Sequence, residues 1–488
     1  MNAGKLCISV AAKTADELAA QIERAAAIGD IVEIRFDDLD RSAISQISDL
    51  KLEISVIATY RSDSREARLA FWNDQNSSFW ACDLEEDIYA SVACQRKIAS
   101  FHDHEGIPND LANVYARLAA LDADIVKIAV TANAVTDAIP VWKLLDRAAS
   151  SGQEIIPIAM GEAGTWTRIL GLAHGAFLTY ASLDQGKETA DGQMTARDML
   201  GVYRVKELDR ETRVYGVIGD PVSQSLSPYM QNAAFAAVGE NAVFLHLPVR
   251  DLDEFLMRMV KPATREVDLN FAGFSVTMPH KLAIMRHLDG IDPMAEAVGA
   301  VNTVKIGQNG RLIGYNTDVH GIIAPLTARY GELSGARIAV LGAGGAARAC
   351  VYGLKAAGAK PELFVRDPRN ANALATEFAI DANAISDLSS KISNFDVVIN
   401  ATPVGMEGEL VGQTLLTADE LSGVKFVYDL VTRPDGTALQ HAAAEAGIPC
   451  IGGIEMLIAQ GAKQFEIWTG REAPLELMRE AILERIGG

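Results

Sequence analysis

The sequence predicts an α/β protein in two parts, an N-terminal (β/α)8 barrel and a C-terminal part with its own parallel sheet. Over roughly the first 205 residues, eight short apolar runs rich in β-branched residues alternate with segments of helical period. A polar segment, 206–213, then interrupts the pattern, and a glycine-rich turn follows at residue 342. Strands that alternate with amphipathic helices are typical of parallel sheets.

The elements of the first part follow one another in regular order. The candidate strands cover residues 7–10, 31–36, 53–60, 79–84, 97–102, 125–130, 154–160 and 175–181. Between the first two, the pattern predicts a helix that begins after Thr14 as N-cap and ends at Gly29. Eight βα units in this length favour a barrel. The connection between the third and fourth strands is short, so its helix is expected to be reduced or missing, and an open seven-stranded sheet is the alternative.

The breaks in the pattern predict three domains. Residues 1–207 are expected to form the barrel. Residues 213–315 are expected to form an α/β substrate-binding domain, to which C-terminal helices at 455–488 return. Residues 325–454, around the glycine-rich turn, are expected to form a nucleotide-binding domain.

Charge and cysteine content limit the classes of partner. The chain of 488 residues carries a net charge of −20, which repels phosphate backbones and anionic lipids, so neither nucleic acid nor membrane is an expected partner. Its five cysteines are scattered, with no C-x-x-C motif and no metal-ligand spacing. Buried free thiols, no metal and a cytoplasmic location are therefore expected. The oligomeric state stays open.

The glycine-rich turn has the pattern of a Rossmann dinucleotide site. Gly342, Gly344 and Ala347 have G-x-G-x-x-A spacing between an apolar strand and a helix. Glycines at such a turn let a pyrophosphate approach the helix N-terminus, where unpaired N–H groups favour an anion. A purely structural turn is the alternative reading.

The end of the next strand indicates which dinucleotide binds. Arg366 stands where a binder of the unphosphorylated cofactor would carry an acid, and Arg369 is close by. Guanidinium groups there favour the 2′-phosphate of NADP. Asp367 favours NAD, so both cofactors stay open, with NADP preferred.

Polar groups end several strands ahead of the glycine-rich turn. Ser225 and Ser227 are hydroxyl donors that could bind a carboxylate, or could cap a helix before Pro228. Lys281 and Asp318 would each alone be read as a solvated charge, but together with Asn302 they form a set. Reduction of a ketone creates an alkoxide, which an ammonium held by a carboxylate can stabilise and protonate.

The barrel pattern contains an unusual lysine. Lys127 lies inside an apolar strand, where desolvation should lower its pKa and free its amine to attack a carbonyl. A lysine on an edge strand that reaches solvent is the alternative. His102 ends the preceding strand, and Glu33 and Arg35, two residues apart, point to one face of an early strand. Lys, His, Arg and Glu at strand ends are typical of the catalytic face of a barrel.

Residues 215–460 resemble the shikimate dehydrogenase family. The matching segments are GVIGDPVSQSLSP, GFSVTMPHK, GAVNTV, GYNTDVHG, GAGGAARA, INATPVGM, VYDLV and GGIEMLIAQGAKQFE. The resemblance implies that Lys281 and Asp318 are the catalytic pair. It implies substrate contacts from Ser225, Ser227, Thr277, Asn302, Asp318 and Gln460. It implies cofactor contacts from Gly342, Gly344, Gly345, Ala347, Arg366, Arg369, Thr402 and Gly453. For Thr402, a simple turn at the end of a strand is the alternative.

Residues 5–200 resemble the type I 3-dehydroquinate dehydratases, which are barrel enzymes. The matching segments are IVEIRFD, TYR, SFHD, DIVKIAV, MGEAGTWTRI and, more loosely, ETADGQ. The resemblance implies that Lys127 forms an imine with the substrate and that His102 is the general base and acid. Substrate contacts are implied for Glu33, Arg35, Arg61, Arg168 and Gln193. The chain departs from the family after Arg61, where the usual loop is shortened and Glu66 could replace a lost contact.

Together the two resemblances imply consecutive reactions on small carboxylate substrates. The barrel would dehydrate 3-dehydroquinate to 3-dehydroshikimate, and the second part would reduce 3-dehydroshikimate to shikimate with NADPH. One alternative is an NAD-dependent quinate or shikimate dehydrogenase whose N-terminal barrel is weak, regulatory or without catalysis.

Overall fold

The computed structural model describes residues 2–40, 44, 53–74, 79–406, 408–433 and 435–487. The chain divides into two compact units. The first comprises residues 1–214, 221–223 and 241–271, and the second comprises residues 215–220, 224–240 and 272–488.

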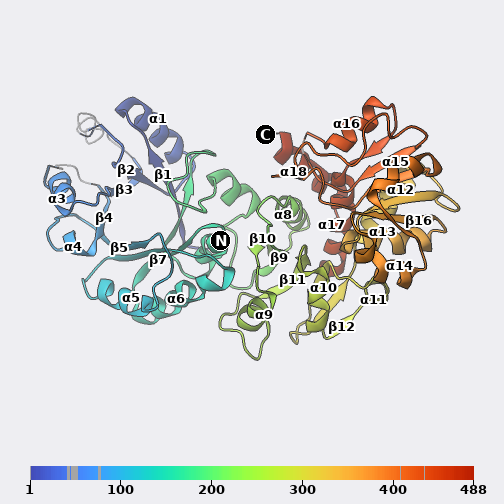
Figure 1. Ribbon diagram of the computed structural model, residues 1–488. Helices are drawn as coiled ribbons and strands as arrows, with labels where there is room; N and C mark the ends of the chain where they lie inside the picture. The colour runs from blue at the N-terminus through green and yellow to red at the C-terminus, as the bar shows by residue number, and fades with distance from the viewer. Residues whose placement is uncertain are drawn as a thin grey trace. The chain divides into compact units, whose positions relative to one another are not determined.

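The first unit contains the predicted parallel barrel (Figure 1). Its strands are β1 (Lys5–Ala11), β2 (Ile31–Arg35), β3 (Ser55–Thr59), β4 (Ala81–Glu85), β5 (Lys97–Asp103), β6 (Ile125–Thr131), β7 (Glu154–Met160) and β8 (Leu178–Ser182). They lie in the order β7-β6-β5-β4-β3-β2-β1-β8. Beside β8, Phe177 N donates to Ile155 O of β7 at 2.8 Å, so the two end strands meet and the sheet nearly closes. The open seven-stranded alternative is therefore wrong.

Helices lie outside the strands of the barrel (Figure 1). They are α1 (Ala15–Ala26), α3 (Arg65–Asp74), α4 (Glu86–Tyr89), α5 (Leu111–Ala119), α6 (Ile139–Ser151) and α7 (Thr165–Leu170). Thr14 caps α1 as predicted, accepting a hydrogen bond from Glu17 N at 3.4 Å. The expectation of a reduced helix between the third and fourth strands is wrong, because α3 has 10 residues. The short helix is instead α4, with 4 residues.

Two layers of side chains fill the barrel interior. The floor layer is the apolar set Cys7, Ile31, Ile57, Ala81, Ile98, Ile125, Ile156 and Leu178, all buried in one cluster. Side chains two positions apart on a strand point the same way. The next layer, here called the pocket layer, is therefore Ser9, Glu33, Thr59, Asp83, Ser100, Lys127, Ile158 and Tyr180. A polar layer thus lies on an apolar floor, toward the carboxyl ends of the strands.

Two further sheets follow the barrel. One is mixed, with the order β10-β9-β11-β13-β14-β12. Its strands are β9 (Arg213–Gly219), β10 (Ala242–Pro248), β11 (Phe271–Val276), β12 (Gly290–Ile291), β13 (Thr303–Ile306) and β14 (Leu312–Tyr315). The helices between and directly after these strands in the chain are α8 (Ser227–Ala237), α9 (Leu252–Phe255), α10 (His280–Ala283), α11 (Pro293–Val298) and α12 (Asp318–Tyr330).

The last sheet is parallel, with the Rossmann-type order β17-β16-β15-β18-β19-β20. Its strands are β15 (Arg337–Leu341), β16 (Lys360–Val365), β17 (Ala382–Ala384), β18 (Val397–Asn400), β19 (Phe426–Asp429) and β20 (Cys450–Ile451). The accompanying helices are α13 (Gly345–Ala356), α14 (Asn372–Phe378), α15 (Leu388–Lys391), α16 (Ala438–Glu445), α17 (Gly453–Thr469) and α18 (Leu475–Gly487). Separate apolar clusters cover its two faces, as expected for a doubly wound sheet.

The cysteines differ in part from the expectation of free thiols. Cys82 on β4 and Cys94 ahead of β5 form a disulfide, because neighbouring strands bring their Cα atoms to 6.3 Å. Cys7 and Cys350 are free and buried, and Cys450 is free and exposed.

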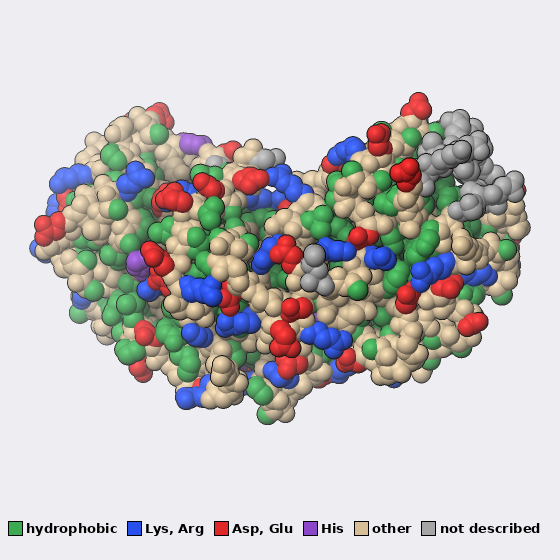
Figure 2. All heavy atoms as spheres, turned by 180° about the vertical axis from the view of Figure 1, so that it is seen from behind, with side chains coloured by type: hydrophobic (Ala, Val, Ile, Leu, Met, Phe, Trp, Pro, Cys, Tyr) green, Lys and Arg blue, Asp and Glu red, His purple; other side chains and the backbone are tan. Residues whose placement is uncertain are grey.

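Charge is mixed on one face of the protein. Acidic and basic side chains are interspersed over the face shown in Figure 2. No helix within the described ranges has the length and apolar character needed to cross a membrane. In the same ranges, no three His, Cys, Asp or Glu side chains are grouped as metal ligands.

Two candidate active sites

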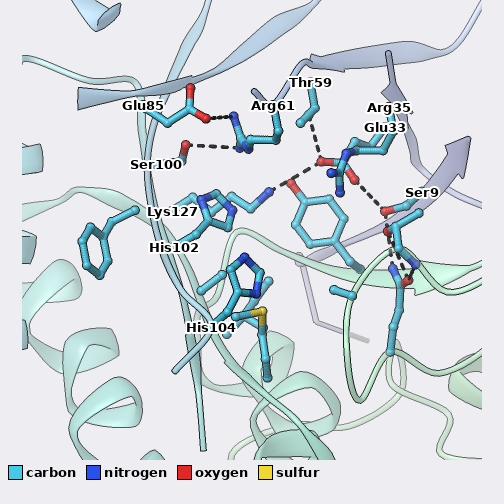
Figure 3. Close-up of a pocket in the computed structure, with 18 of the residues that line it drawn as sticks. Ser9, Glu33, Arg35, Thr59, Arg61, Glu85, Ser100, His102, His104 and Lys127 are labelled. Carbon is cyan, nitrogen blue, oxygen red and sulfur yellow. Dashed lines mark hydrogen bonds and ion pairs between the residues drawn. The ribbon is translucent and has the colours of Figure 1, made fainter. Parts of the chain in front are cut away.

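The barrel holds a pocket of about 580 Å³ at the carboxyl ends of its strands. The pocket layer supplies most of its base, and the loops beyond the strands supply its walls. The seven residues that the sequence predicted for this site all line it, namely Glu33, Arg35, Arg61, His102, Lys127, Arg168 and Gln193. Figure 3 shows Lys127 and Glu33 pointing toward one another, with His102 beside the lysine.

Lys127 lies at the centre of the pocket layer, and its side chain is 7% exposed. Its Nζ donates to Asp83 Oδ2 at 2.7 Å and lies 3.5 Å from Glu33 Oε1. It also lies 4.4 Å from the centre of the Tyr180 ring. The lysine is therefore enclosed within the barrel, and the alternative of an edge-strand lysine reaching solvent is wrong.

The two carboxylates beside Lys127 are ionised in spite of their burial. Burial alone would raise the pKa of Asp83, but the charges of Arg61 and Lys127 hold it well below its usual range. Burial opposes ionisation of Glu33 as well, and Lys127 and Arg35 lower its pKa. Two anions thus face the Lys127 nitrogen, at 2.7 and 3.5 Å.

His102, on β5, is poised as a neutral base. Burial, followed by the nearby charges of Arg61 and Lys127, lowers its pKa well below the usual value of an imidazole. At neutral pH the ring therefore has a lone pair with which to accept a proton.

Arg168, on α7, has the properties of an anion-binding group. It is 2% exposed, and burial lowers its pKa to about 10. Its Nη2 donates to Asp191 O at 3.4 Å, while Nε has no hydrogen-bond partner in the described part of the chain. Because a buried guanidinium is costly without an anion, the position suits a substrate carboxylate.

The other predicted residues of the barrel site are held by protein groups. Arg35 pairs with Asp37 at 2.6 Å. Arg61 pairs with Asp83 at 2.6 Å and with Glu85 at 3.1 Å. Gln193 Nε2 donates to Ser9 Oγ at 3.4 Å. Glu66 is exposed on α3, does not line the pocket and accepts from Ser64 Oγ at 3.1 Å.

Sequence reasoning missed Asp83 and Tyr180. Asp83 is 0% exposed and contacts both Arg61 and Lys127, and Tyr180 lies under the lysine. Asp83 lies two positions after Ala81 and Tyr180 two positions after Leu178, just as Lys127 lies two positions after Ile125. Aligning the strands on their buried apolar residues would have identified both.

The second unit brings the predicted pair Lys281 and Asp318 together. Lys281 Nζ donates to Asp318 Oδ2 at 2.6 Å. The lysine side chain is 20% exposed and that of the aspartate is 4% exposed, so one partner is open to solvent or substrate and the other is not. Asp318 is the first residue of α12, where the helix dipole stabilises a carboxylate.

Neutral side chains hold this aspartate. Asn302 Nδ2 donates to Asp318 Oδ1 at 2.8 Å and to Thr317 Oγ1 at 2.9 Å. Gln460 Oε1 lies 3.4 Å from Asn302 Nδ2, so this predicted residue joins the same cluster. The sequence reasoning missed Gln464, whose Nε2 donates to Ser275 Oγ at 2.9 Å and supports the network from α17.

The remaining predicted substrate residues lie at neighbouring strand ends. Ser225 follows β9, and its Oγ accepts from the N–H of Ser227, the first residue of α8, at 3.3 Å. Thr277 follows β11, and its N–H donates to Ile218 O at 2.9 Å.

The glycine-rich turn has room for a dinucleotide. Gly342 has φ +113°, and a Cβ there would lie 2.9 Å from Ala401 O. A Cβ on Gly344 would meet nothing within 4 Å, so the backbone is open to a pyrophosphate. Gly345 begins α13 without a side-chain cap, and Ala347 packs in the core. The open N-terminus of this helix fits the phosphates of the cofactor.

The other predicted cofactor residues border this turn. Arg366 is exposed at the end of β16. Arg369 is 85% exposed and pairs with Asp367 at 2.7 Å. Thr402 donates to Asn400 Oδ1 at 2.7 Å, which has the form of a turn at the end of a strand. Gly453 begins α17, where a Cβ would lie 2.5 Å from Leu430 O.

Family models match nearly the whole chain. The type I 3-dehydroquinase model matches residues 6–210. The shikimate dehydrogenase substrate binding domain matches residues 217–304, and the shikimate/quinate 5-dehydrogenase model matches residues 326–415. The shikimate 5′-dehydrogenase C-terminal domain matches residues 453–483.

Shikimate dehydrogenases match the second part of the chain. A shikimate dehydrogenase (NADP(+)) of Methanopyrus kandleri is 40% identical over 57% of this chain and 98% of its own length. A crystal structure of a shikimate dehydrogenase in complex with NADP+ has 38% identity and a TM-score of 0.51, covering 57% of this chain and 97% of that chain.

One relative spans both parts. The chloroplastic bifunctional 3-dehydroquinate dehydratase/shikimate dehydrogenase of Arabidopsis thaliana is 33% identical over 98% of this chain and 84% of its own length. Both resemblances are thereby confirmed in one relative and in the order in which they occur here. The chain belongs to the bifunctional 3-dehydroquinate dehydratase/shikimate dehydrogenase family.

Proposed function

We propose that Lys127 and Lys281 are the catalytic amines of two consecutive reactions, dehydration of 3-dehydroquinate and reduction of 3-dehydroshikimate. The observation that carries the proposal is that each lysine contacts a buried aspartate, at 2.7 Å in the barrel and 2.6 Å in the second unit. The surroundings of the two pairs then assign them different chemistry.

In the barrel, Lys127 attacks the ketone carbon of 3-dehydroquinate as a free amine. The proton that Lys127 gave up before attack returns to the hydroxyl of the adduct, which leaves as water, and Asp83 and Glu33 stabilise the cationic imine that results. The imine acidifies the adjacent C–H, and neutral His102 removes that proton. The same imidazole protonates the departing hydroxyl, and hydrolysis of the imine restores the lysine. Arg168 binds the substrate carboxylate.

Arg35, Arg61 and Gln193 also line the barrel pocket. They are proposed to hold the substrate hydroxyls together with Glu33. Because Arg61 is paired with two protein carboxylates, its contribution includes fixing Asp83 beside the lysine.

In the second unit, the Lys281 ammonium faces the ketone oxygen of 3-dehydroshikimate. NADPH, when bound, supplies the hydride. Lys281 stabilises the developing alkoxide and donates a proton to its oxygen, and Asp318 keeps the ammonium oriented. Ser225 and Ser227 bind the substrate carboxylate, while Thr277, Asn302 and Gln460 contact its hydroxyls.

The cofactor is proposed to be NADP, on the open turn at Gly342, Gly344 and Gly345, with Ala347 behind it. We assign contacts with the 2′-phosphate to Arg366 and Arg369. Gly453 is proposed to leave room for the cofactor near the turn, and Thr402 is proposed to lie at the nicotinamide end of the binding site. The relatives named NADP(+)-dependent support this assignment.

The NAD-dependent alternative also has an observation in its favour. Asp367 holds Arg369 at 2.7 Å, so this carboxylate could accept ribose hydroxyls instead. A quinate dehydrogenase of Corynebacterium glutamicum, solved with NAD, has 29% identity and a TM-score of 0.50. Comparing kcat/KM for NADPH with that for NADH, and for shikimate with that for quinate, decides between the two.

The same proposal includes a division into three domains, at residues 1–207, at 213–315 with 455–488, and at 325–454. It also includes a cytoplasmic location, which cell fractionation tests. Small carboxylates are the proposed partners.

A coupled assay tests the whole proposal. NADPH oxidation starting from 3-dehydroquinate should occur with the wild type and be lost in both Lys127→Ala and Lys281→Ala. Only Lys127→Ala should still reduce added 3-dehydroshikimate. Coupled activity in Lys127→Ala would overturn the assignment of the imine.

A further inference from the structure

Tyr180 is a member of the pocket layer that neither resemblance assigned. It lies on β8 two residues after the floor-layer residue Leu178, it lines the pocket, and it is 4% exposed. Its ring lies 4.4 Å from Lys127 Nζ. The side chain therefore forms part of the surface that any molecule bonded to Nζ must meet.

The hydroxyl of Tyr180 has no hydrogen-bond partner in the described part of the chain, although it is buried. The polar neighbours differ in this respect. Ser9 and Thr59 donate to Glu33 at 2.7 and 2.9 Å, and Ser100 donates to Leu84 O at 3.2 Å. A buried hydroxyl without a partner destabilises the fold, so its presence at the reacting group points to a ligand that supplies the partner.

The phenol keeps a proton that it can donate in such a contact. Burial, together with the charge of Glu33, raises the pKa of Tyr180 well above its usual value, so the proton stays on the oxygen. A ligand atom with a lone pair, such as a hydroxyl or carbonyl oxygen, would therefore satisfy this hydroxyl.

We propose that Tyr180 is a substrate-contacting residue of the dehydratase, whose hydroxyl donates a hydrogen bond to the substrate hydroxyl on the carbon next to the ketone. This inference rests on the proposed imine at Lys127. Once that imine forms, the substrate carbon is bonded to Nζ, and the neighbouring hydroxyl comes within reach of the ring that lies beneath Nζ.

Tyr180→Phe removes the hydroxyl and leaves the ring in place. For 3-dehydroquinate, kcat/KM should fall about tenfold, as expected for one neutral hydrogen bond to a substrate. The midpoint of barrel unfolding should stay unchanged or rise, because no protein contact is lost. This combination of lower activity and undiminished stability is not expected of a merely structural tyrosine.

Tyr89→Phe is the matched control in the same barrel. Its ring also lies under a lysine, with Lys97 Nζ at 4.9 Å, but its hydroxyl donates to Asp122 O at 3.4 Å and the residue does not line the pocket. Its kcat/KM should equal that of the wild type.

A substrate analogue separates a direct contact from an indirect effect. With 4-deoxy-3-dehydroquinate, which lacks the hydroxyl in question, the wild type and Tyr180→Phe should have equal kcat/KM. Unchanged activity of Tyr180→Phe on 3-dehydroquinate, or the same tenfold loss on the analogue, would overturn the proposal. Borohydride trapping at Lys127 in the wild type tests the imine separately, so failure of the proposed function is recognised independently of Tyr180.

Discussion

The two candidate active sites share a lysine–aspartate pair of nearly the same length and differ in the residues around it. In the barrel, Lys127 is 7% exposed and has a second carboxylate, Glu33, at 3.5 Å. In the second unit, Lys281 is 20% exposed, and its partner Asp318 is held by the neutral amide of Asn302. One pair lies inside a dense network of charges, and the other is a single ion pair supported by dipoles.

The difference shows that a short ion pair does not by itself define a catalytic role. Two anions around an enclosed amine stabilise a cation that is covalently bonded to substrate, as in an imine. In the proposed reduction, a single carboxylate beside a more exposed ammonium leaves the proton available for the substrate oxygen. The surrounding residues, more than the pair itself, distinguish covalent from proton-transfer chemistry.

The largest expected effect separates the two lysines. Lys127→Ala should lower dehydratase kcat about 10⁴-fold or more, since the nucleophile is removed, and leave the reductase unchanged. Lys281→Ala should do the reverse. Separate assays with 3-dehydroquinate and 3-dehydroshikimate measure this. Loss of both activities in either variant would mean that the sites are not independent.

Replacing the two aspartates should change the free energy of unfolding by different amounts, while the two losses in kcat should be similar. Asp83→Asn leaves Arg61 and Lys127 with one anion fewer in a buried site. The free energy of unfolding should therefore fall by about 3 kcal/mol, and dehydratase kcat should fall about 10²-fold. Asp318→Asn should lower reductase kcat by a similar factor but cost only about 1 kcal/mol, since its charged partner Lys281 is 20% exposed and its neighbour Asn302 is a neutral amide. Urea unfolding and steady-state kinetics measure both. Equal stability losses would contradict the comparison.

Arg366→Ala should act on the second unit alone. We expect KM for NADPH to rise about tenfold, because an exposed contact to phosphate is lost, while KM for NADH stays the same. Initial rates with the two cofactors measure the ratio. Parallel changes for both would show that Arg366 does not contact the 2′-phosphate.

The smallest expected effect concerns pH. The pKa of His102 is lowered, so the neutral base persists below the pKa of about 6.5 of an ordinary histidine, and kcat/KM of the dehydratase should fall less than about twofold between pH 7.5 and 6. Below pH 6.5 the unfolded imidazole binds a proton that the folded one does not. Stability should therefore decrease as the pH falls through that range, and above it His102 contributes nothing. A half-maximal rate near pH 6.5 assigned to this group would contradict the lowered pKa.

Part of each site was predictable because its residues follow local patterns. Lys127 stood out as a charge inside an apolar strand, and the glycines at 342 and 344 stood out by spacing. Asp83 did not, because a carboxylate after two apolar residues, Ala81 and Cys82, also fits a solvated strand end. Only closure of the barrel places Asp83 beside the lysine, 44 residues further along the chain.

The helices of the barrel show the same limit. The predicted N-cap at Thr14 was correct, because capping is a contact over three residues. The expectation of a reduced or missing helix between the third and fourth strands was wrong. Helix α3 forms there and makes tertiary contacts such as the ion pair of Arg68 with Asp87 at 2.8 Å. Polar composition in 62–70 concealed that helix.

The sequence by itself determined the α/β class, the barrel followed by a Rossmann-type sheet, and most of the residues that face the two sites, because period and spacing are local properties. Only the tertiary structure decided which polar groups meet: among the described residues, two carboxylates lie at Lys127, one lies at Lys281, and the phenol of Tyr180 lies beside Lys127 without a hydrogen-bond partner. Such contacts join strands far apart in the chain, and their energies depend on burial, which no local pattern specifies.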